Sequence, residues 1–132
     1  LTAGTLAAKI VSVSGSSRYF MGSVSAYAVE IKERILHVPS EIIAQHGVVS
    51  AEVAMGMAEG VRKVLGTDVA LATTGEAEAT RTQPGEVWMG YADHQGTDAD
   101  HAVLRYTRTV NMERAANYAM QFALKKVRTA VE

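Results

Sequence analysis

Two long segments with helical periodicity enclose a series of short apolar segments, and this order limits the folds that the chain can adopt. Apolar residues recur every three or four positions between Ser50, a predicted N-cap, and Gly66, a predicted helix stop. A second helix is predicted to start at an Asn111 cap and to run as far as Val127. The segments between these helices that predict buried strands are residues 69–72, 87–92 and 102–106.

Shorter elements are predicted in the first third of the chain. The spacing of apolar residues, with turn residues at its ends, indicates helices over residues 2–13, 29–36 and 39–47. Residues 19–27 are aromatic and β-branched with small residues between them, which predicts a strand. Because predicted strands and helices alternate in the first half and strands follow one another in the second, we expect an α/β protein. Its predicted architecture is a three-layer α/β/α sandwich with a mixed β-sheet.

Length and composition indicate the domain organisation and the class of partner. A chain of 132 residues without an internal repeat or a linker predicts a single domain over residues 1–132. Its 13 basic and 14 acidic residues are interspersed, whereas a nucleic acid or a membrane surface requires a concentrated basic face. No apolar run approaches the ~20 residues that span a bilayer, and the first residues do not resemble a signal peptide. We therefore expect a cytoplasmic protein that binds a small molecule, with neither nucleic acid nor membrane as a partner.

The sequence does not favour metal or thiol chemistry. It contains no cysteine, so disulfides, thiolate metal sites and a cysteine nucleophile are excluded within it. His94 and His101 lie near Asp93, Asp98 and Asp100, and such a cluster could suggest a metal-binding loop. The spacing matches no standard metal site, however. We therefore predict a solvated hairpin turn at this position and neither a metal nor another cofactor.

A chemically suggestive set of side chains lies between Gly15 and Lys32. Ser17 follows a glycine turn, Tyr27 lies ten positions later near the end of the predicted strand, and Lys32 follows five positions after that. A lysine can act as general base for a serine only if its pKa falls well below ~10.4. Burial or neighbouring cations lower the pKa, and a tyrosine hydroxyl can orient or relay the proton. Such residues more often serve as a helix cap, a core tyrosine and a solvated lysine, so their spacing alone does not establish a catalytic role.

The motifs of the chain, in their order, resemble those of the CinA C-terminal domain family, the nicotinamide mononucleotide amidohydrolases. That family opens with Glu-Ser-x-Thr-Gly-Gly, so its Glu-Ser pair would precede Leu1, and we expect N-terminal residues of the family fold to be missing from this sequence. The match covers nearly the whole chain, and its most specific part is the spacing of the serine, tyrosine and lysine. The matching segments are Leu-Thr-Ala-Gly at 1–4, Gly-Ser-Ser-Arg-Tyr-Phe at 15–20, Gly22, Val24, Tyr27, Lys32, His-Gly-Val-Val-Ser at 46–50, Thr74-Gly75, Pro-Gly-Glu-Val-Trp at 84–88 and Arg108.

The resemblance implies an activity and a set of site residues. The implied reaction is hydrolysis of the carboxamide of nicotinamide mononucleotide, through an acyl-enzyme, to nicotinate mononucleotide and ammonia, without a cofactor. The family also tends to self-associate, so we expect a homo-oligomer. Carried over position by position, the implied roles are Ser17 as nucleophile, Lys32 as its base, Tyr27 as the partner hydroxyl, and Thr74, Gly75 and Arg108 as substrate-binding residues.

The chain departs from the family pattern mainly around the expected substrate. Val29 replaces an asparagine, and the glycine-rich loop after the Thr-Gly turn carries Glu76 and Glu78 instead of small residues. Carboxylates near an anionic nucleotide would repel it, and loss of glycine removes close backbone approach to a phosphate. Two alternatives therefore stand beside the leading hypothesis. One is a family member acting on another amide or phosphorylated substrate, and the other is a catalytically impaired domain that binds a nucleotide or a protein partner.

Overall fold

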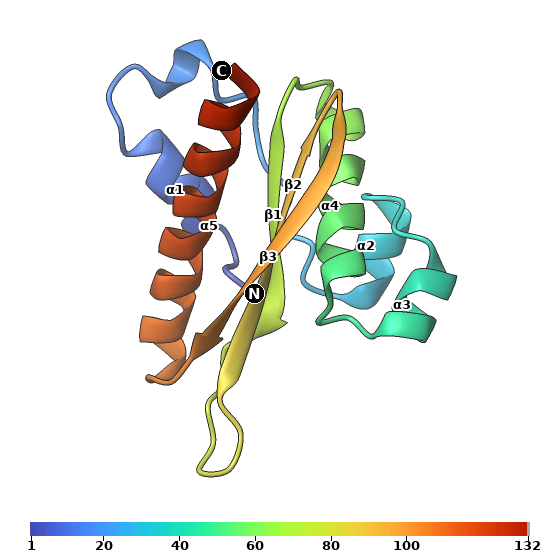
Figure 1. The fold of residues 1–132 in the computed structure, drawn as a ribbon, viewed down its shortest axis with the longest axis vertical. Coiled ribbons are helices and arrows are strands. Elements are labelled where there is room, and N and C mark those ends of the chain that lie inside the picture. Colours follow the sequence, from blue (N-terminus) through green and yellow to red (C-terminus); the bar gives the residue numbers. More distant parts are fainter. Residues whose placement is uncertain (132) are drawn as a thin grey trace.

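Five α-helices, one short 3-10 helix and three strands make up residues 1–131, the part of the chain that the computed structural model describes (Figure 1). All five predicted helices are present, each within a few residues of its expected bounds. No helix of the described part is long and apolar enough to cross a membrane. In chain order the elements are α1 (Thr5–Val11), η1 (Ser16–Arg18), α2 (Val29–Arg34), α3 (Ser40–His46), α4 (Ala51–Leu65), β1 (Ala70–Glu76), β2 (Gly85–Asp93), β3 (Gly96–Leu104) and α5 (Arg108–Val131).

The three strands form one sheet in the order β1-β2-β3, with both pairs antiparallel. A tight turn joins β2 to β3, and within it Asp93 Oδ1 accepts a hydrogen bond from Gln95 N at 2.8 Å. Strands joined by such hairpins pair antiparallel, so the predicted mixed sheet is wrong for the described residues. The predicted strand over residues 19–27 is also wrong, because this segment runs past β1 as an extended trace without pairing to it.

Helices cover both faces of the sheet, as the α/β prediction requires (Figure 1). On one face α4 packs against all three strands, with α2 and α3 beyond it; Leu36, Val38, Val53 and Met57 are buried there. On the other face lie α1 and α5. There the buried residues are Val87, Met89, Tyr91, Leu104, Ala115, Ala119 and Phe122. The two layers of side chains form two separate cores, one on each side of the sheet.

The ends of α4 follow the sequence signals closely. Ser50 Oγ accepts a hydrogen bond from Val53 N at 3.3 Å, which is the predicted N-cap, and Gly66 ends the helix with φ of 65°. The predicted Asn111 cap is wrong, because α5 already begins at Arg108. Asn111 instead lies fully buried in the first turns of α5, where a capping side chain would not be needed.

Gly60 and Gly56 of α4 offer a matched test of this packing. A Cβ at Gly60 would collide with the backbone carbonyl of Leu36, whereas one at Gly56 would make an ordinary contact with Val38 at 3.5 Å. We expect Gly60→Ala to lower the free energy of unfolding by about 1–3 kcal/mol through overpacking. Gly56→Ala should be neutral or stabilising by up to about 1 kcal/mol, because alanine favours the helix. Chemical denaturation of both variants checks this, and equal effects at the two positions would contradict the packing described.

Candidate active site

Lys32 is a buried lysine held by backbone carbonyls. Its side chain is only 4% exposed, and its Nζ donates to the carbonyl oxygens of Ala26 at 2.7 Å and Tyr27 at 3.0 Å. Both carbonyls belong to the extended segment that enters α2, so the side chain folds back over the start of its own helix. Burial disfavours the ammonium and lowers the pKa of Lys32 below the ordinary lysine value. In the described part of the chain, no carboxylate pairs with Lys32 to offset this effect.

These two hydrogen bonds match the needs of a neutral amine. An ammonium carries three N–H donors, whereas a neutral lysine amine carries two donors and one lone pair. Because the two carbonyls can satisfy both donors of the neutral form, its lone pair is left to accept a proton from a nearby hydroxyl. The surroundings of Lys32 therefore suit a general base.

The first residues of the chain lie next to Lys32 and Arg108. The pKa of the Leu1 amine is lowered, chiefly by burial and then by the positive charges of Lys32 and Arg108. Thr2 Oγ1 and Thr73 Oγ1 are 3.2 Å apart and share a buried hydrogen bond, which fixes the N-terminal segment against β1. The Leu1 amine thus lies within electrostatic range of two cations from distant parts of the sequence.

Arg108, at the start of α5, is already engaged by the two glutamates of the altered loop. Its Nη1 lies 3.2 Å from Glu78 Oε2 and 4.0 Å from Glu76 Oε1. The hydrogen bond that Arg108 donates to the Glu78 carboxylate is the main cause that raises the pKa of Arg108. All three side chains are about half exposed, so solvent screens the attraction and the pairs can open. A phosphate that binds Arg108 must therefore displace or accommodate these carboxylates.

The structure brings together only some of the predicted site residues. Tyr27 contacts Lys32 through its carbonyl, while the residue itself is 73% exposed and contributes to the raised pKa of Arg108. Thr74 is buried, and its hydroxyl donates to the carbonyl of Val48 at 2.9 Å. Next to it, Gly75 packs against the Leu1 side chain. Thr74 and Gly75 thus lie near the end of β1, close to Leu1. The Thr74 hydroxyl, however, already donates its hydrogen bond to the protein backbone.

Comparison with known proteins identifies the domain. The model of the CinA C-terminal domain matches residues 1–127. The chain belongs to the CinA C-terminal domain family. A CinA-like protein of Salinibacter ruber is 44% identical over 126 residues, covering 92% of this chain and 31% of that protein. A CinA-like protein of Geobacter sulfurreducens is 46% identical over 99 residues, covering 72% of this chain and 24% of that protein. The chain therefore spans less than a third of the length of these two relatives.

Solved structures share the fold of this CinA C-terminal domain. Competence damage-inducible protein A from Klebsiella pneumoniae superposes with a TM-score of 0.89 at 24% identity, covering 96% of this chain and 81% of that one. Competence/damage inducible protein CihA from Agrobacterium tumefaciens gives a TM-score of 0.82 at 24% identity, covering 94% and 79%. At this level of identity the likeness concerns the fold alone.

Ser17 lies apart from the other predicted catalytic residues of the CinA C-terminal domain. It is exposed in η1, which contacts α1, whereas Lys32 lies in α2 on the other side of the sheet (Figure 1). In the described part of the chain, no hydrogen bond joins Ser17 to Tyr27 or Lys32. The neighbouring Ser16 is the buried one, and its Oγ donates to the Val11 carbonyl at 3.4 Å. The predicted meeting of the three side chains is therefore not found within one chain.

Asn111 joins two segments of the CinA C-terminal domain in a way that the sequence analysis missed. Its Nδ2 donates to the carbonyls of Ala77 at 2.8 Å and Tyr106 at 2.9 Å, and its Oδ1 accepts from Tyr106 N at 2.9 Å. The loop that carries Glu76 and Glu78 is thereby tied to the segment before Arg108. A possible signal was the asparagine itself, because its amide can bond to backbone groups near a helix start as well as cap the helix.

Proposed function

We propose that this domain is an amidohydrolase that hydrolyses the carboxamide of nicotinamide mononucleotide, with Lys32 as the general base. The observation that carries the proposal is the burial of Lys32 without a carboxylate partner in the described chain. A buried amine of lowered pKa suits proton transfer. Membership of the family supports the choice of substrate class, and ammonia release from nicotinamide mononucleotide is the test.

In the proposed reaction Lys32 moves one proton in each direction. Its neutral amine takes the proton of the attacking hydroxyl while the oxygen bonds to the carboxamide carbon. The resulting ammonium gives that proton to the departing nitrogen, so ammonia leaves and an acyl-enzyme remains. Lys32 then deprotonates a water that cleaves the ester, giving the carboxylate and the free hydroxyl. Arg108 would hold the phosphate, because its planar fork matches two phosphate oxygens.

The position of Leu1 bears on which hydroxyl attacks. In the family pattern Glu-Ser-x-Thr-Gly-Gly, the threonine corresponds to Thr2, so the serine corresponds to the position directly before Leu1. The positive charge of Lys32 helps to lower the pKa of the Leu1 amine, so a residue bonded to the Leu1 nitrogen would lie in the neighbourhood of Lys32. Ser17 lacks this proximity. We therefore propose the serine of the family pattern, in place of Ser17, as the nucleophile that Lys32 activates.

Glu76 and Glu78 are expected to weaken the binding of a phosphorylated substrate. Because Glu78 pairs with Arg108 at 3.2 Å, removal of both carboxylates should free the guanidinium for phosphate. We expect the variant with Glu76→Ala and Glu78→Ala to bind nicotinamide mononucleotide about 3- to 10-fold more tightly at low salt, and the gain should shrink as salt screens the charges. Calorimetric titration measures this effect.

A matched variant separates this local effect from net charge. Glu41→Ala with Asp98→Ala removes two acidic side chains that make no contact with Arg108, and it should leave the affinity unchanged. Equal gains in both double variants would contradict a role for the Arg108 pairs. Tight binding by the unchanged protein without ammonia release would favour the second candidate function, a catalytically impaired domain that binds a nucleotide. Self-association is proposed from the family resemblance alone.

A further inference from the structure

A single buried amide connects the two segments that carry Glu78 and Arg108. Asn111 is fully buried, and its Nδ2 donates to the carbonyl of Ala77 at 2.8 Å. The same side chain bonds twice to the backbone of Tyr106, because Nδ2 donates to the carbonyl and Oδ1 accepts from the amide, both at 2.9 Å. Buried polar groups that are fully satisfied hold a single geometry. One side chain therefore fixes the backbone directly before Glu78 and two residues before Arg108.

Arg108 and Asn111 contact the same loop from one helix. They lie three positions apart in α5, so their side chains are neighbours on its surface. Asn111 holds Ala77 by its carbonyl, while Arg108 Nη1 reaches the carboxylate of the next residue, Glu78, at 3.2 Å. The bond to Ala77 is buried, whereas the ion pair is about half exposed and can open. The loop backbone therefore stays in place when the ion pair opens, and the carboxylate returns to the same guanidinium.

An open hollow of about 530 Å³ lies beside this ion pair. The charged side chains that line it are Glu78, Arg105 and Arg108, and Tyr106 and Thr107 form part of the same wall. Of the two arginines, Arg108 alone has a carboxylate partner in the described part of the chain. Because Glu78 holds this guanidinium, a phosphate that approaches Arg108 through the hollow must compete with it. A ligand without an anionic group does not meet this competition.

We propose that Asn111 is a positioning residue that holds Glu78 against Arg108, and that this arrangement selects against phosphorylated ligands. Asn111 acts through the loop backbone and touches no ligand itself, because it is fully buried. The inference rests on the proposed role of Arg108 as the phosphate ligand, and it adds a substrate preference. The domain should favour nicotinamide mononucleotide over unphosphorylated nicotinamide riboside less strongly than it would if Arg108 were unpaired.

Titration with inorganic phosphate at low ionic strength tests the inference through a double-mutant cycle. We expect Glu78→Ala to raise the phosphate affinity about 2- to 5-fold, the range for an exposed ion pair. Asn111→Ala should raise it at least about twofold, because the loop no longer keeps the carboxylate at the guanidinium. In the Glu78→Ala background, Asn111→Ala should give no further gain. The control Asn117→Ala, at an exposed asparagine of the same helix, should have no effect in either background.

A second variant leaves the buried amide in place. Glu78→Asp shortens the side chain by one methylene, about 1.5 Å, so on a fixed loop the carboxylate falls short of Arg108. The phosphate affinity should then rise nearly as much as in Glu78→Ala, while the affinity for nicotinamide riboside should not rise. A mobile loop would instead follow the shorter side chain, and the phosphate affinity would equal that of the unchanged protein.

Four results would overturn the inference. The first is weaker phosphate binding by a folded Asn111→Ala variant, since Asn111 would then hold Arg108 itself in place. The second is an equal gain from Asn111→Ala with and without Glu78, since the two residues would then act independently. The third is unchanged affinity in Glu78→Asp, and it decides the question if Asn111→Ala does not fold. The fourth is the absence of saturable phosphate binding by Glu78→Ala. If binding follows the expected pattern and ammonia is not released, the proposed activity fails while the positioning role of Asn111 stands.

Discussion

Lys32→Arg is expected to lower kcat for nicotinamide mononucleotide by about 100- to 10,000-fold, the usual contribution of a general base. Arginine stays protonated at every working pH and cannot accept the proton of a hydroxyl. In the unchanged protein the base form exists above the pKa of Lys32, so the rate should fall as the pH drops through that value. Because burial lowers this pKa, activity should persist at a pH where an ordinary lysine is fully protonated.

Two controls guard this prediction. Lys63→Arg alters an exposed lysine of α4, and its rate and pH profile should match those of the unchanged protein. Lys32→Met removes the amine without adding a larger cation. Thermal unfolding of Lys32→Arg and Lys32→Met then shows whether a loss of rate comes from the missing base or from a disturbed fold. A folded Lys32→Arg variant with a normal rate would exclude Lys32 as the base.

The nucleophile prediction has an equally large expected effect. In a chain that carries the family's Glu-Ser pair before Leu1, replacing that serine by alanine should lower kcat at least about a thousandfold. Ser17→Ala in the same chain should keep kcat within about twofold, because Ser17 lies in η1 away from Lys32. Steady-state ammonia release measures both variants. A large loss in Ser17→Ala with an intact fold, and none at the added serine, would restore Ser17 as the nucleophile.

The parts of the fold that the sequence predicted well have local causes. α4 is bounded by Ser50 and Gly66, and both act through bonds or dihedral angles within a few residues. β1, β2 and β3 follow from apolar runs separated by turn residues. The hairpin turn predicted around His94, Asp98 and Asp100 proved shorter, because Asp98 and Asp100 belong to β3, an edge strand whose exposed polar residues interrupt the apolar pattern. For these three strands, existence was therefore predicted better than length.

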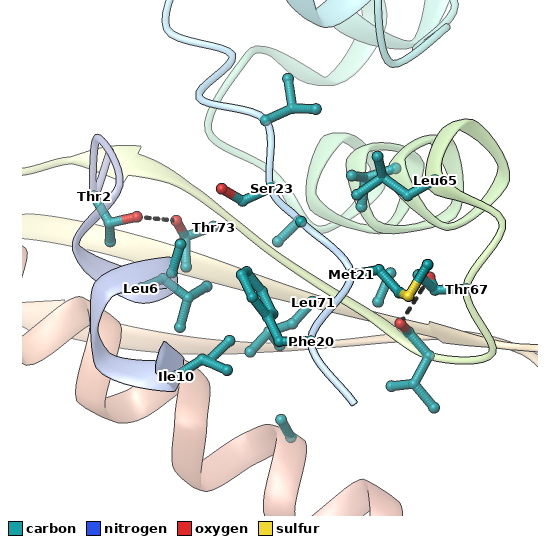
Figure 2. A pocket seen from close by; sticks show the side chains of 18 of the residues that line it. Thr2, Leu6, Ile10, Phe20, Met21, Ser23, Leu65, Thr67, Leu71 and Thr73 are labelled. Atoms are coloured by element: carbon teal, nitrogen blue, oxygen red, sulfur yellow. Dashed lines mark hydrogen bonds between the residues drawn. The ribbon is translucent and has the colours of Figure 1, made fainter. Parts of the chain in front are cut away.

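The features that the sequence could not predict depend on distant neighbours. Residues 19–27 have strand-like composition, but pairing needs an adjacent backbone, and a cavity of about 930 Å³ lies between this segment and β1 (Figure 2). The sequence predicts a helix cap at Asn111, because asparagine is common at that position. Its buried hydrogen bonds to Ala77 and Tyr106 exist only in the folded chain and could not be predicted. In both segments the tertiary contacts, and not the local sequence preference, determine the structure.

The candidate site shows the same division. The spacing from Ser17 and Tyr27 pointed to Lys32 as a site residue. Its burial could not be predicted, because it depends on the side chain folding back to the carbonyls of Ala26 and Tyr27. The loop glutamates were expected to oppose a phosphate, and the structure adds that they pair with Arg108. Which serine lies near Lys32 could not be derived from spacing, because η1 and α2 lie on different sides of the sheet.

The most direct test of the central claim is the product formed from nicotinamide mononucleotide in heavy-oxygen water. The account predicts stoichiometric ammonia and a nicotinate mononucleotide whose new carboxylate carries one labelled oxygen, since water cleaves the acyl-enzyme. The rate should depend on Lys32. Release of free nicotinamide with label on the ribose, or no ammonia from a folded protein that carries the Glu-Ser pair before Leu1, would contradict the account.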